Sequence, residues 1–103
     1  MKTSELTGPW LDYFVAKAEH GNTKTVLPYA HDWTYGGPII EEQRIMIGHC
    51  ADDPVGKQWF AQMEFEPRAD GVRRAKVLFC ETPLIAAMRA YVVSKFGDEV
   101  PDA

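Results

Sequence analysis

Apolar residues recur at helical spacing near the start of the chain. Thr7 is suited to cap a helix there, Pro9 to occupy its first turn and Gly21 to end it. The pattern predicts an amphipathic helix over residues 9–20. Its expected core stripe is Trp10, Leu11, Phe14, Val15 and Ala18. Its expected outer face is Asp12, Tyr13, Ala16 and Glu19.

A second helix is predicted over residues 83–96. Thr82 is suited to be its N-cap, Pro83 its first residue and Gly97 its end. Apolar residues surround this helix on nearly all sides, which indicates burial on more than one face. Its second cover is either the rest of this chain or another copy of the protein.

Small residues on this second helix favour another copy. Ala86, Ala90 and Ser94 recur every four residues, a spacing that lets two helix backbones approach closely. We therefore expect a homo-oligomer that forms through the C-terminal helix.

Two segments between the helices alternate in the manner of β-strands, over residues 57–66 and 72–80. A turn with an Asp-Gly pair separates them, so we expect an antiparallel hairpin. Weaker patterns predict strands over 44–48 and 23–27, a structured loop over 31–38 and one or two helical turns over 38–42. The faces predicted for the hairpin are Trp59, Ala61, Met63 and Phe65 on the first strand, and Ala75, Val77 and Phe79 on the second.

Together these elements predict a single α+β domain over residues 1–103. The length suits one core, and 46% hydrophobic with 25% charged residues is ordinary for a globular protein. No apolar run approaches the twenty or so residues that cross a bilayer, and no secretory signal is evident, so we expect a cytoplasmic protein without a membrane role. In that compartment Cys50 and Cys80 are expected to remain thiols.

The charge and the motifs disfavour several classes of function. A net charge of -4 argues against nucleic-acid binding, and the cluster Arg73, Arg74 and Lys76 is typical of a solvated strand edge. Adjacent His49 and Cys50 point to opposite sides of a strand, which disfavours a metal site. No nucleophile motif, complete phosphate loop or dinucleotide fingerprint occurs. We expect no catalytic residues, no metal and no cofactor.

Three segments, taken together, resemble a known family. They are KTSELTG at 2–8, DWTYGGPIIE at 32–41 and TPLIAAMRAYVVSKFGD at 82–98. Their order and content are similar to those of the NinX-like small phage accessory proteins. The resemblance implies a gene carried by phages or prophages and a protein that acts inside the infected bacterium and is dispensable for building the particle. It implies no activity for any residue.

The best candidate site is the loop predicted over residues 31–38. Aromatic rings there are suited to stack a planar base. A phosphate could be held by the N–H groups of Gly36 and Gly37 together with a helix start at Pro38. Arg89 would complete the site, or would instead snorkel or pair with Glu41 or Asp32. The competing interpretation is a tight loop in which Trp33 fills the core. The candidate ligand-binding residues are His31, Asp32, Trp33, Tyr35, Gly36, Gly37 and Arg89.

Two hypotheses for the function follow. The first is a non-enzymatic phage protein that sequesters a small anionic, nucleotide-derived host molecule, such as an antiviral defence signal, in pockets shared with an oligomeric partner. The second is an interaction module that inhibits or redirects a host or phage protein through an exposed apolar face.

Overall fold

The structure is a computed structural model that describes residues 1–52, 54–64 and 75–101. An antiparallel sheet packs against a helix that other helices surround, so the predicted α+β class is confirmed. In chain order the elements are η1 (Thr3–Glu5), α1 (Gly8–His20), α2 (Trp33–Gln43), β1 (Met46–His49), β2 (Trp59–Glu64), β3 (Ala75–Cys80) and α3 (Pro83–Phe96).

The sheet has the order β1-β2-β3 and is antiparallel throughout. Trp59 pairs with Cys80 in the register of β2 and β3, which confirms the predicted hairpin. Ala61, Met63 and Cys80 are buried on the face that packs against α3, while Phe79 lies on the opposite, exposed face. The turn predicted at 67–71, Phe65, and the basic residues Arg73 and Arg74 lie outside the described residues.

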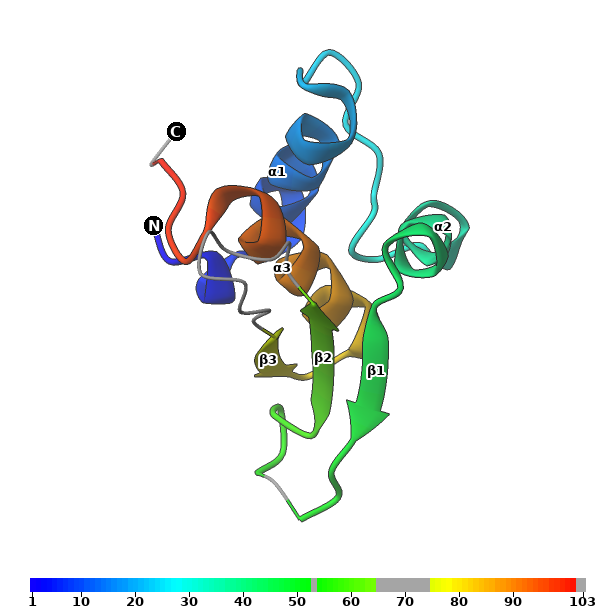
Figure 1. Cartoon of the computed structure of the whole chain (residues 1–103), viewed down its shortest axis with the longest axis vertical. Coiled ribbons are helices and arrows are strands. Elements are labelled where there is room, and N and C mark those ends of the chain that lie inside the picture. Colours follow the sequence, from blue (N-terminus) through cyan, green and yellow to red (C-terminus); the bar gives the residue numbers. More distant parts are fainter. Residues whose placement is uncertain (53, 65–74, 102–103) are drawn as a thin grey trace.

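Helix α3 lies at the centre of the molecule (Figure 1). It contacts α1, α2, η1 and all three strands, and its ten residues from Leu84 to Val93 are all buried. The predicted bounds are confirmed, and so is the cap, because the Thr82 hydroxyl accepts a hydrogen bond from the Ile85 N–H at 3.1 Å. Ala86 and Ala90 are covered within this one chain, so they are not free to meet a second copy.

Helix α1 has the predicted bounds, but the predicted inner and outer faces are partly wrong. Trp10 is exposed, whereas Asp12 and Ala16 are buried. The buried arc is shifted because the chain that follows α1 folds back over it: the Ala30 N–H donates to the Asp12 carboxylate at 2.9 Å. Gly21 ends the helix with a left-handed backbone, as the sequence indicates.

The middle of the chain differs most from the prediction. Residues 23–27 form no strand, and the segment predicted as a loop at 31–38 is mostly helix, because α2 begins at Trp33. Asp32 starts this helix, since its carboxylate accepts a hydrogen bond from the Thr34 N–H. Pro38 lies inside the helix instead of opening it. The strand predicted at 44–48 is present as β1, displaced by one or two residues.

The first and last described segments of the chain lie side by side (Figure 1). Lys2 and Glu99 form an antiparallel bridge, and the buried Thr3 hydroxyl donates to the Gly97 carbonyl at 2.8 Å. Cys50 and Cys80 are free thiols. Within the described part of the chain, no helix is long and apolar enough to cross a membrane.

Candidate functional site

The first turns of α2 carry most of the predicted ligand-binding residues, but not in the expected arrangement. The Gly36 N–H donates to the Asp32 carbonyl at 3.0 Å and is part of the helix. The Asp32 carboxylate occupies the N-terminus of the helix, where an anion would have to bind. The prediction that Gly36 offers its N–H to a phosphate is therefore wrong.

Trp33 and Tyr35 both reach solvent, with exposed fractions of 52% and 38%. Residues two apart on an α-helix point about 200° away from each other. The two rings consequently flank the buried stripe of α2 on opposite sides, and within one chain they cannot clamp the same planar ligand. Trp33 does not fill the core either, so the structure matches neither interpretation of the predicted loop; His31 is exposed beside it.

The two glycines of α2 have different surroundings. Gly36 is buried, and a side chain there would meet the Tyr29 carbonyl oxygen and would approach the Leu84 Cδ1 atom to 2.6 Å. Gly37 faces the Trp33 ring at an ordinary contact distance. Gly36 thus allows α2 to pack closely on α3, and its role is structural.

Arg89 lies apart from this group. Its side chain is only 7% exposed, and its Nε–H donates to the Leu6 carbonyl oxygen at 2.7 Å. That carbonyl belongs to the segment between η1 and α1. The alternatives in which Arg89 pairs with Glu41 or Asp32 do not occur, and the Leu6 backbone is its hydrogen-bond partner instead.

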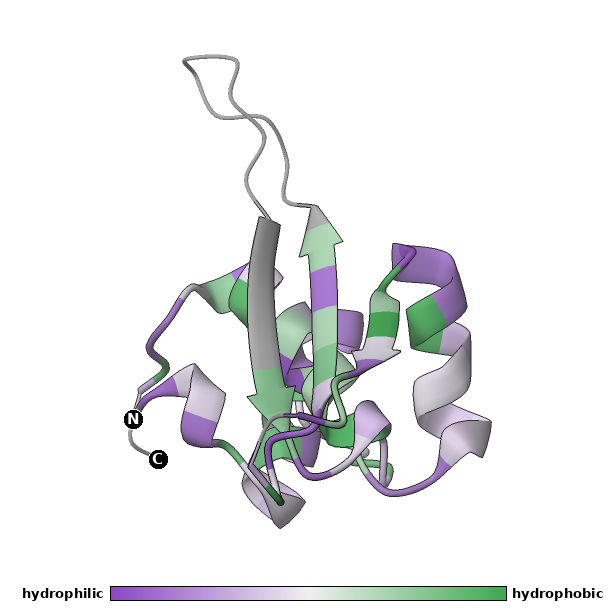
Figure 2. Ribbon diagram, turned by 90° about the horizontal axis from the view of Figure 1, so that it is seen from below, coloured by the Kyte–Doolittle hydropathy of each residue, from purple (hydrophilic) through white to green (hydrophobic). Residues whose placement is uncertain are grey.

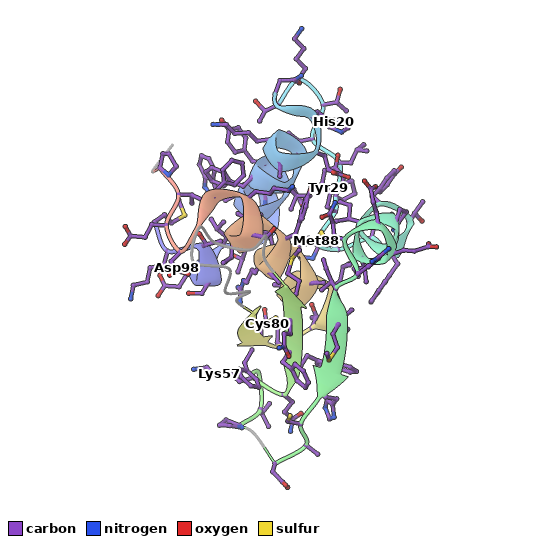
Figure 3. The ribbon with its side chains drawn as sticks, in the orientation of Figure 1. His20, Tyr29, Lys57, Cys80, Met88 and Asp98 are labelled. Atoms are coloured by element: carbon purple, nitrogen blue, oxygen red, sulfur yellow. The ribbon has the colours of Figure 1, made fainter. Side chains whose placement is uncertain are left out.

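A polar network that the sequence did not reveal joins α1, the following loop and α3. The Tyr91 hydroxyl donates to the Glu19 carboxylate at 2.7 Å. The Tyr29 hydroxyl oxygen lies 3.3 Å from the His20 Nε2 atom, and both residues are labelled in Figure 3. Burial and the hydrogen bond to Glu19 raise the pKa of Tyr91. Burial, followed by the charges of Glu19 and Asp12, raises the pKa of Tyr29. These hydrogen bonds connect the helices and the loop, and the raised pKa values mean that both phenols stay neutral to a higher pH than an exposed tyrosine does.

The sheet face that points away from α3 carries exposed apolar side chains. We call Met46, Gly48, Phe60 and Phe79 the outer sheet face. Met46 and Phe79 are 57% and 46% exposed, and the Phe60 and Phe79 rings lie 5.8 Å apart between centroids. The Phe60 ring lies against Gly48, where a Cβ atom would collide with it. The alternation had left Phe60 on the face away from Trp59 and Ala61, so the signal for Phe60 was present in the sequence. For the second strand the predicted apolar face was wrong: Phe79 pairs with Phe60 on the exposed side, and Cys80 lies on the buried side. Figure 2 shows that β2 and the coloured end of β3 consist mostly of hydrophobic residues.

A cavity of about 260 Å³ lies where the two ends of the described chain meet, lined by Lys2, Ser4, Val93, Asp98 and Glu99. It is separate from the residues predicted as the site. Among the described residues, no group of three or more His, Cys, Asp or Glu side chains is placed to hold a metal ion.

Comparison with known proteins adds one finding. A family model described as bacteriophage P22, NinX, matches residues 21–95, which include α2, the sheet and nearly all of α3. No curated protein matches the chain.

Proposed function

Because the chain belongs to the NinX family of bacteriophage P22, we propose that it is a phage accessory protein that works without catalysis, by binding another protein. Its place of action is the cytoplasm of the infected bacterium. The geometry favours the interaction module over the aromatic small-ligand pocket, since α2 separates the two candidate rings.

The observation that carries this proposal is the outer sheet face. Exposed large apolar side chains that cluster on one surface are typical of interaction sites. Met46 and Phe79 expose about half of their surface, and the Phe60 ring is held in place between Gly48 and Phe79. A ring that is already ordered loses little conformational entropy on binding.

The face is smaller than a complete interface. Stable protein–protein contacts bury about 800 Å² on each partner, whereas three short strands present roughly a third of that area, from strand spacing and rise. The outer sheet face would therefore form the apolar centre of a larger contact, where aromatic side chains usually contribute most of the binding energy.

The test is capture of a partner from phage-infected cells with the tagged full chain. We expect one stoichiometric protein to be retained by the wild type and lost with Phe79→Ser. The matched control is Val55→Ser, because Val55 is 93% exposed in the loop between β1 and β2 and lies outside this face. Unchanged thermal unfolding of both variants would show that folding is intact. Retention of the partner by Phe79→Ser, or no stoichiometric partner at all, would contradict the proposal.

One observation supports capture of a nucleotide-derived anion as the second candidate. The Trp33 ring is half exposed, and a second copy of the chain could supply the missing side of a stacking site. Under this hypothesis nucleotides raise the unfolding temperature of the wild type and not of Trp33→Ala. A response that is equal in the two proteins would remove Trp33 from consideration.

A further inference from the structure

Arg89 is a buried cation that uses only a small part of its hydrogen-bonding capacity toward the described residues. A guanidinium carries five N–H donors. The hydrogen bond of Arg89 uses only the donor on Nε, which donates to the Leu6 carbonyl. The remaining four donors belong to the two Nη atoms. Since 93% of the residue surface is covered, the direction of these donors is fixed by the surrounding protein.

The Nη atoms reach solvent. Among the described side chains, every nitrogen and oxygen that is shut off from solvent has a hydrogen-bond partner. Arg89 hydrogen-bonds to the described residues through Nε alone, so we infer that its Nη atoms lie at an opening and not in a sealed interior. The aliphatic part of the side chain thus lies in the core, and the two Nη atoms, which we call the Arg89 fork, lie at a small opening to solvent.

No described carboxylate forms an ion pair with this guanidinium, whose hydrogen bond goes to the Leu6 backbone. The Leu6 carbonyl is neutral, and the Cys80 thiol nearby donates to the Thr82 carbonyl at 3.1 Å, with a pKa that burial raises. A buried charge costs several kcal/mol unless an opposite charge or a full set of hydrogen bonds compensates it. An anion at the opening would provide both.

We propose that the Arg89 fork binds the oxyanion group of a small ligand, a carboxylate or a phosphate. Two parallel N–H groups match two oxygens of such a group, which a lysine ammonium cannot reproduce. Because the exposed fraction is so low, the opening admits a small group and not a flat protein surface. This site is independent of the outer sheet face, and either can exist without the other.

Inorganic phosphate and acetate are the probes, titrated at constant ionic strength while thermal unfolding is followed. We expect a saturable rise in Tm with at least one of them, and the effective anion identifies the group. Arg89→Lys should weaken the effect about tenfold or more, because the ammonium keeps the charge and loses the fork. Arg44→Lys is the matched control, since Arg44 is exposed at the end of α2.

A second readout covers the case in which Arg89→Lys does not fold. In wild-type protein labelled with ¹⁵N, the Nε–H resonance of Arg89 should shift saturably with the same anion and the same midpoint. An equal rise in Tm for Arg89→Lys and wild type would reveal a general salt effect and overturn the proposal. So would an Nε–H resonance that neither anion moves.

Discussion

At the scale of the residue, Gly36 and Gly37 are neighbours that should respond oppositely to the same change. Gly36→Ala places a methyl group against the Tyr29 carbonyl and the Leu84 side chain, and a backbone atom cannot move aside. We expect a loss of about 1–3 kcal/mol in the free energy of unfolding. Gly37→Ala meets only the Trp33 ring at 3.8 Å and should gain about 0.5–1 kcal/mol from helix propensity.

Urea denaturation of both variants measures this pair. Opposite shifts of the midpoint would show that close packing, and not chain flexibility, requires the first glycine. Two stabilising shifts would mean that α2 does not lie as close to α3 as the structure has it.

Which side chains of an element are buried and which are exposed was the part of the fold that the sequence predicted least well. Helical spacing identified α1, but Trp10 is exposed and Asp12 is buried. Periodicity reports where apolar residues recur, whereas burial also depends on what covers the helix. Here the loop after α1 places the Ala30 N–H on Asp12, so a carboxylate is satisfied inside the protein. No local pattern contains that information.

At the scale of the element, Tyr91 and Glu19 join α3 to α1. The buried Tyr91 hydroxyl is hydrogen-bonded to the carboxylate, so Tyr91→Phe should cost about 1–3 kcal/mol near neutral pH. The raised pKa also predicts the alkaline behaviour. Above pH of about 10 the unfolded chain releases the phenol proton while the folded chain keeps it. Stability is therefore full below that pH and decreases as the pH rises further.

The measurement is the free energy of unfolding between pH 8 and 11 for the wild type, Tyr91→Phe and Tyr29→Phe. Each buried phenol contributes up to about 1.4 kcal/mol per pH unit to the decrease, so each variant should have a shallower slope than the wild type. Because the pKa of Tyr29 is also raised, neither single variant should abolish the slope. A Tyr91→Phe protein with the wild-type slope would show that this phenol titrates normally.

Elements with clear ends were predicted well, and α2 was not. The helix α3 has a Thr-Pro start and a Gly end, and both were found where expected. In α2, two glycines and Pro38 are typical of a loop, yet the Asp32 cap and close packing on Leu84 favour a helix. This error also misplaced the candidate site, because a loop can bring Trp33 and Tyr35 together and a helix separates them.

At the scale of the whole molecule, α3 is the element that the rest of the chain covers. The sequence correctly indicated that this helix lacks a polar face, but it left open whether a second copy provides the cover. In the structure, α1, α2, η1 and the sheet surround it, and Ala86 is fully buried. The homo-oligomer stays a prediction, and an oligomer of this folded chain would have to form through other surfaces.

Ala86→Leu distinguishes the two arrangements. If Ala86 is covered within one chain, the larger side chain overpacks the core and lowers the free energy of unfolding by about 1–3 kcal/mol. That loss is intramolecular, so the denaturation midpoint should shift equally at all protein concentrations, and the particle size in light scattering should not change. If Ala86 instead lay between copies, the shift would depend on concentration and the variant would form a smaller particle than the wild type. The latter result would restore α3 as the contact between subunits.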